Sequence, residues 1–227
     1  MKQIFIIALV IGIALTNAMG QKQGGIVFEQ VINIHKNLSP EQQAYIAMLP
    51  EFSKRKYQFV FNEKQGVLKV LPQEQPEGMM IMTSGGGNDA FVDFKKQVYR
   101  NYIEVDGEVF CTEVPIIPVS EIKATGKTKK ILNYECKEYR GEGTEFSLWI
   151  CESLPAGISP MPPIFGNGAV LSMESDKLSF TAVSFSKGID AKELTPKEAQ
   201  VITAEQYKDL QEEKIGEMKA MSGSKVN

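Results

Sequence analysis

The chain has 227 residues, with 25 Lys and Arg against 28 Asp and Glu, and a formal net charge of −3. The charges are interspersed and form no basic run, which argues against nucleic acid as a partner. The sequence has one histidine and none of the common nucleotide-binding, metalloprotease or α/β-hydrolase motifs. It therefore predicts no catalytic residues, no metal site, no cofactor and no enzyme.

The first 20 residues have the pattern of a secretory signal peptide. Lys2 supplies a positive start, residues 4–15 are apolar, and Ala18 and Gly20 are the small residues of a cleavage site. The apolar run is shorter than the roughly 20 residues of a membrane span. We expect cleavage before Gln21, a periplasmic or secreted protein, and no membrane span after cleavage. An uncleaved anchor is the alternative.

Three strands and a short helix are expected next. Residues 26–34 are rich in β-branched residues, and residues 56–62 alternate, with 67–71 as a hairpin partner. Between the first two strands, Ser39 is a good N-cap and Pro40 suits the first helical position, so residues 40–49 should form a helix. The glycine-rich excursion of residues 72–88 contains Met79, Met80 and Met82. These methionines pack loops more often than they bind Cu(I).

The next hairpin is the best determined. Residues 98–105 and 108–114 flank Asp106 and Gly107, a dipeptide that favours a tight type I′ turn. A two-residue turn predicts these opposed pairs: Ile103 with Phe110, Tyr99 with Val114, Arg100 with Glu113, and Tyr102 with Cys111.

A second hairpin is expected from residues 131–140 and 145–151, around residues 141–144. A four-residue loop pairs Arg140 with Glu145, whereas a two-residue loop sets Cys136 directly opposite Cys151. In an oxidising compartment these two cysteines are the first choice for a disulfide, leaving Cys111 free. The alternative is three buried thiols that act as small apolar residues.

A loop rich in proline and glycine follows, residues 153–168, and it leads to a third hairpin. The loop is either a shaped functional element or a linker. Residues 169–174 and 177–185 flank Ser175 and Asp176, and a two-residue turn there predicts these pairs: Met173 with Leu178, Leu171 with Phe180, and Glu174 with Lys177.

The C-terminal part is expected to be helical. Thr195 and Thr203 both begin capping-box patterns, and residues 204–221 are strong helix formers with a thin apolar stripe. We therefore divide the chain into a signal peptide (1–20), an antiparallel β domain (21–190), a helical segment (191–221) and a disordered tail (222–227). The fold class is mainly β (α+β), with one antiparallel sheet, a short N-proximal helix and a C-terminal helix.

Several segments together resemble the GLPGLI family of exported proteins, found mainly in Bacteroidetes. They are HKNLSPEQQAYIAMLPEF, YQFVFNEKQ, LNYECKEYRGEGTEFSLWICESLPAGISP and ITAEQYKDLQEEKIGEMKAM. The chain departs from the family in the segment that gives it its name, where Asn167 replaces a proline while Gly168 is kept. The resemblance implies export and a curved sheet or half-barrel, as in periplasmic lipoprotein carriers. It brings no catalytic residues.

The candidate binding residues lie around the Pro/Gly loop. They are Trp149, Met161, Phe165, Gly166 and Gly168. Trp149 either closes the core or lies with Met161 and Phe165 at the mouth of an apolar groove. We expect a non-enzymatic binding or interaction module of the cell envelope, with an envelope protein as partner. The alternative is a periplasmic carrier that holds an apolar or lipid-like ligand in the concave face of the sheet.

Overall fold

The computed structural model describes residues 22–72, 89–105, 107–116, 122–141, 145–161 and 167–223. The predicted signal peptide, most of the glycine-rich excursion, Asp106 and residues 224–227 lie outside these ranges. Among the site residues predicted above, Phe165 and Gly166 also lie outside them.

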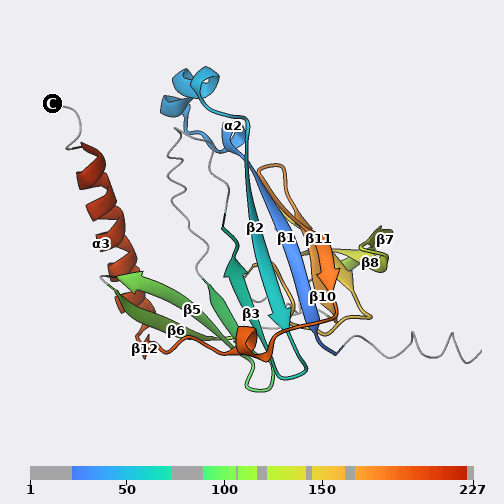
Figure 1. Ribbon diagram of the computed structural model, residues 1–227. Helices are drawn as coiled ribbons and strands as arrows, with labels where there is room; N and C mark the ends of the chain where they lie inside the picture. Colours follow the sequence, from blue (N-terminus) through green and yellow to red (C-terminus); the bar gives the residue numbers. More distant parts are fainter. Residues whose placement is uncertain are drawn as a thin grey trace, which may run out of the picture.

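The described residues form one open sheet of 12 strands. Its order is β12-β6-β5-β4-β3-β2-β1-β11-β10-β9-β8-β7 (Figure 1). The strands are β1 (Gly24–Asn33), β2 (Phe52–Phe61), β3 (Gln65–Val70), β4 (Ala90–Asp93), β5 (Val98–Val105), β6 (Glu108–Pro115), β7 (Ile122–Ile131), β8 (Tyr134–Gly141), β9 (Ser147–Cys151), β10 (Ala169–Glu174), β11 (Leu178–Ser186) and β12 (Gln200–Val201).

The mainly β prediction is confirmed, and the predicted antiparallel sheet is found except at one edge. The last strand, β12, runs parallel to β6, with Gln200 opposite Phe110 and Val201 opposite Cys111. After β11 the chain crosses to the far edge of the sheet, so that β12 enters beside β6 in the same direction. The sheet is therefore mixed at this edge.

Turn chemistry predicts the register correctly in one hairpin and incorrectly in another. All four predicted pairs between β5 and β6 are present, and Gly107 has the positive φ of 83° that the turn requires. Between β10 and β11 the predicted register is wrong by two residues, because Met173 lies opposite Phe180. Ser175 N donates to the Leu178 carbonyl at 2.9 Å, so the turn is one residue later than predicted. A two-residue shift keeps every side chain on its face.

The hairpin between β7 and β8 was not predicted. Leu132 and Asn133 form its turn with positive φ angles of 51° and 69°, in a sequence without the glycine that marks such turns. The next pairing, β8 with β9, sets Lys137 opposite Ile150. One step further along both strands, Cys136 lies opposite Cys151. This is the second of the two registers that the sequence left open.

The predicted N-proximal helix is a 3₁₀ helix, η1 (Pro40–Met48), and a one-turn helix, α2 (Ile34–Asn37), precedes it. Pro40 occupies the first turn as expected, and Ser39 N donates to Gln42 Oε1 at 3.0 Å. The segment is flanked by β1 and β2 and projects beyond their ends (Figure 1).

The C-terminal part is only partly helical. Thr195 begins no helix, because the 3₁₀ helix η2 (Ala191–Leu194) ends there and β12 follows. Thr203 does cap α3 (Ala204–Gly223): Gln206 N donates to Thr203 Oγ1, and Thr203 N donates to Gln206 Oε1. Tyr207 is buried and the helix lies against β5 and β6.

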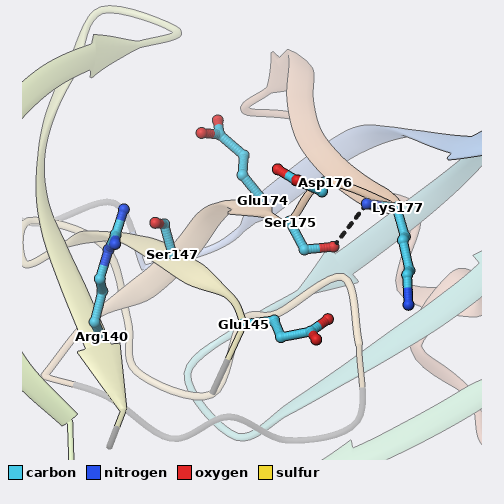
Figure 2. Close-up of a pocket in the computed structure, with 7 residues that line it drawn as sticks. All are labelled: Arg140, Glu145, Ser147, Glu174, Ser175, Asp176 and Lys177. Atoms are coloured by element: carbon cyan, nitrogen blue, oxygen red, sulfur yellow. Dashed lines mark hydrogen bonds between the residues drawn. The ribbon is translucent and has the colours of Figure 1, made fainter. Parts of the chain in front are cut away.

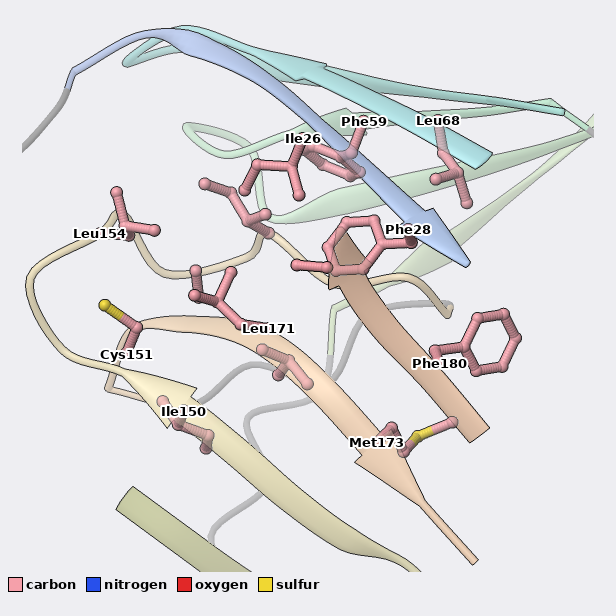
Figure 3. Close-up of a cluster of buried hydrophobic side chains, with 14 of the residues drawn as sticks. Ile26, Phe28, Phe59, Leu68, Ile150, Cys151, Leu154, Leu171, Met173 and Phe180 are labelled. Carbon is pink, nitrogen blue, oxygen red and sulfur yellow. The ribbon is translucent and has the colours of Figure 1, made fainter. Parts of the chain in front are cut away.

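The main core lies on one face of the sheet (Figure 3). Phe28 of β1, Phe59 of β2 and Met173 of β10 are all nearly inaccessible to solvent. The described part of the Pro/Gly loop packs into the same core through Leu154 and Ile158. This part of the loop is therefore a shaped structural element. A smaller cluster on the other side includes Val60, Phe91 and Leu194.

Gly168 gives a direct test of how closely the Pro/Gly loop returns to the sheet. A Cβ at this position would lie 2.1 Å from the Cys151 carbonyl oxygen, which is backbone and cannot rotate away. We expect Gly168→Ala to lower the free energy of unfolding by about 2–3 kcal/mol, measured by urea denaturation. Gly188→Ala is the control, because nothing lies within 4 Å of its Cβ. Equal unfolding midpoints for the two variants would contradict this packing.

Candidate functional site

An exposed apolar surface covers the projection between β1 and β2. We call residues 39–52 the β1–β2 tip. Its large apolar side chains are exposed as follows: Tyr45 58%, Ile46 37%, Met48 75%, Leu49 37% and Phe52 50%. Several large apolar side chains exposed on one short segment are a feature of interaction sites in folded proteins.

Hydrogen bonds hold the base of the tip in place. His35 Nε2–H donates to the Leu49 carbonyl at 2.9 Å, and Ile34 N donates to the Glu51 carbonyl at 2.8 Å. Asn33 Oδ1 accepts from Lys36 N at 2.9 Å and so caps α2. The only histidine of the chain therefore supports the tip.

Sequence reasoning predicted a helix in the tip but assigned no function to it. The available signal was the apolar run of residues 44–49 between Pro40 and Pro50. Every residue from 40 to 49 is exposed. Among the described elements, none makes more than a weak contact with this short 3₁₀ helix, so the run is not buried against a second layer there.

A polar pocket of about 550 Å³ lies at the ends of β8, β9 and β10 (Figure 2). It is lined by Arg140, Glu145, Ser147, Glu174, Ser175, Asp176 and Lys177. The lining residues come from three separate segments of the chain, so no local sequence motif predicted the pocket. Its charges are mixed in sign.

Glu174 connects this pocket to the predicted site residue Trp149. Glu174 accepts hydrogen bonds from Lys129 Nζ at 2.5 Å, Ser172 Oγ at 2.8 Å and Trp149 Nε1 at 3.2 Å. Burial raises the pKa of Glu174, but the hydrogen bonds from Lys129 and Ser172 outweigh burial and leave the pKa lowered. Lys129 Nζ also lies 4.1 Å from the centre of the Trp149 ring, a cation–π contact.

The structure places three of the five candidate binding residues. Trp149 is buried in the main core and covered by Lys129, as the core interpretation predicted. Met161 is half-buried against the same core. Gly168 lies against the Cys151 backbone, so its role is close packing. Figure 3 shows Cys151 and Leu154 among the buried side chains of the main core.

Glu138 of β8 is a buried carboxylate surrounded by donors. Thr125 Oγ1 donates to Glu138 Oε2 at 2.7 Å, Arg140 Nη2 donates to Oε1 at 3.1 Å, and Lys127 Nζ lies 3.6 Å from Oε2. The hydrogen bonds from Thr125, Ser147 and Arg140 lower the pKa of Glu138 to about 2, against the opposing effect of burial.

Within the described ranges, no group of three His, Cys, Asp or Glu residues lies close enough together to hold a metal ion. In the same part of the chain, no helix has the length and apolar character needed to cross a membrane.

Glu138 should make stability depend on pH in acid. Its pKa is lowered from the usual 4.5 to about 2, so its contribution is complete above about pH 4.5 and disappears as the pH falls through about 2. We expect Glu138→Gln to lower the free energy of unfolding by about 1 kcal/mol at pH 7 and by nothing measurable at pH 2. Urea denaturation at the two pH values measures this difference.

The matched control is Glu135→Gln, an exposed position on the same strand. This control should change the free energy of unfolding by less than about 0.5 kcal/mol at either pH. If Glu138→Gln lowered the free energy of unfolding as much at pH 2 as at pH 7, the carboxylate charge would not be the cause of the loss.

No protein-family model matches the chain, and no curated protein matches its sequence. Solved structures do match its fold. Two of them are crystal structures of PNGF-II. The C2 crystal form gives a TM-score of 0.58 at 16% identity over 83% of this chain and 32% of that chain. The P21 form gives 0.56 at 18% identity over 83% and 33%. The chain thus spans about a third of the protein it resembles, and the likeness is one of fold.

Proposed function

We propose that the chain is an exported, non-enzymatic interaction module of the cell envelope that docks onto another protein through the β1–β2 tip. The observation that carries this proposal is the exposure of five large apolar side chains on one hydrogen-bonded projection. The resemblance to the exported GLPGLI family supports the location.

The chemistry of the tip suits a protein partner. Tyr, Phe and Met are enriched in the cores of protein–protein interfaces, where they fill apolar pockets. Met48 and Phe52 are at least half exposed, so they are available to enter such a pocket. Because His35 anchors the end of η1, the tip loses little conformational entropy when it binds a partner.

The polar pocket supports a non-enzymatic role. Glu174 is held ionised by three donors, whereas a general acid working near neutral pH needs a raised pKa. Glu138 is likewise held ionised, with its pKa at about 2. These carboxylates stabilise the ends of β8 and β10.

The packing of the sheet favours the interaction role over the ligand carrier. A carrier of an apolar ligand needs an apolar cavity of roughly 300 Å³ or more. The pocket of Figure 2 is large enough but is lined by charged and polar residues. On the main core face, Phe28 and Phe59 are already buried against neighbouring side chains (Figure 3). Phe61 of the same core is buried as well.

Export gives a separate prediction. Signal cleavage should leave Gln21 as the first residue, three positions before β1 begins at Gly24. Mass spectrometry of the protein expressed in its own host should find this N-terminus in the periplasmic or secreted fraction. Recovery of intact Met1 in the membrane fraction would overturn the export proposal and leave the tip proposal untouched.

The docking proposal is tested at the tip itself. A photocrosslinking amino acid in place of Met48, introduced in the native host, should give one discrete protein adduct. The purified partner should then bind the parent protein, and Ile46→Glu should weaken that binding at least about tenfold, because a charge is placed in an apolar contact. Isothermal titration calorimetry measures the affinity.

The matched control is Val183→Glu, which puts the same charge on an exposed valine of β11. It should bind the partner as the parent does. Equal binding by Ile46→Glu and the parent would overturn the proposal. Cosedimentation of the parent with phosphatidylethanolamine and phosphatidylglycerol vesicles, lost in Ile46→Glu, would assign the tip to a membrane surface instead.

A further inference from the structure

Cys136 and Cys151 meet across two neighbouring strands. The register that sets Lys137 opposite Ile150 brings the cysteines opposite each other one step further along. Both residues are completely buried in the main core, and each thiol shifts the pKa of the other. They are free thiols in this structure.

We infer that Cys136 and Cys151 form a structural disulfide that joins β8 to β9 when the chain folds in the presence of a low-molecular-weight disulfide. The strand geometry carries this inference. Opposed residues of an antiparallel pair have Cα atoms about 4.5–5.5 Å apart, and a disulfide needs roughly 4.4–6.8 Å. No movement of the strands is required.

In the folded chain the two thiols have different surroundings. The Cys151 sulfur lies 3.1 Å from the Ser153 hydroxyl oxygen, in hydrogen-bonding contact, whereas the Cys136 thiol donates to the Tyr134 carbonyl at 3.7 Å. The interaction with Cys136 is the largest cause that lowers the pKa of the Cys151 thiol, and the same interaction raises the pKa of Cys136.

Oxidised glutathione forms the disulfide in two exchange steps. The thiolate of one of the two cysteines attacks one sulfur of the glutathione disulfide, forms a mixed disulfide and releases one glutathione. The thiolate of the other cysteine then attacks the protein sulfur of the mixed disulfide and releases the second glutathione. Two electrons pass to the glutathione disulfide, and the two thiol protons end on the two released glutathione molecules.

Burial decides when this reaction takes place. An oxidant the size of glutathione has no access to two sulfurs that are completely buried beside Leu154 and Ile158. The exchange therefore belongs to folding, before the Pro/Gly loop closes over the hairpin. For the same reason the finished disulfide is protected from exchange with folded proteins, which is typical of a structural disulfide.

Cys111 is excluded as a partner by the sheet order. It lies in β6, and seven strands separate β6 from β9 in the described sheet. It belongs to the second core cluster, with Val60 and Phe91. Cys111 thus provides a buried control thiol in the same molecule.

The test is oxidative refolding of the full mature chain. The reduced protein is refolded from urea with oxidised and reduced glutathione, alkylated with N-ethylmaleimide under denaturing conditions and digested with trypsin without reductant. Residues 131–137 should be joined to residues 141–177, while the peptide of residues 101–123 carries an alkylated Cys111. Three alkylated cysteines, or a major linkage through Cys111, would overturn the inference.

Stability gives an independent readout. Reducing the cross-link, which closes a short loop, should lower the folding equilibrium constant about a hundredfold and shift the urea midpoint downward. Cys111→Ser should keep this sensitivity to reductant. Cys136→Ser and Cys151→Ser should each abolish it. An oxidised parent whose midpoint does not respond to reductant would contradict the cross-link, whether or not the serine variants fold.

Discussion

The whole sheet depends on the pairing of β1 with strands from both ends of the chain. β1 pairs with β2 along its full length and with β11 over most of it. Residues 52–115 build the sheet on one side of β1, where β12 is added at the edge, and residues 122–186 build it on the other. Phe28 of β1 lies opposite Tyr57 on one flank and Ala182 on the other, so one buried side chain joins the two halves.

Local turn chemistry explains how much of the fold was predictable. The Gly107 turn specifies its hairpin by itself, and all four predicted pairs are present. Leu132 and Asn133 also adopt positive φ angles, but neither is a glycine. The turn between β7 and β8 therefore could not be predicted from turn residues in the sequence. A strand as short as β12 also has no periodicity to detect. Its position is set by the path of the chain after β11, which is a tertiary property.

The functional surfaces were less predictable because the role of an apolar side chain depends on whether the fold buries it or leaves it exposed. The sequence singled out Trp149 as either core or groove, and the structure resolves this in favour of the core. The apolar run of residues 44–49 looks like a core segment, yet the projection leaves it exposed. The polar pocket joins Arg140 to Lys177 across three strands, and no sequence spacing reveals such a pairing. The cysteine pair was named in advance because both residues lie on strands that the sequence places side by side.

The two flanks of β1 are completed at very different times during synthesis. The β2 flank is available within a few tens of residues, whereas Leu178, the first residue of β11, follows Asn33 by 145 residues. At about 5–20 residues per second, a ribosome takes roughly 7 to 30 s to cover that distance. Throughout this interval the nascent chain presents the backbone N–H and C=O groups of β1 as an unsatisfied edge, open to pairing with any other extended polypeptide nearby. The order of the strands thus makes protection by a holding chaperone most valuable until β11 has been made.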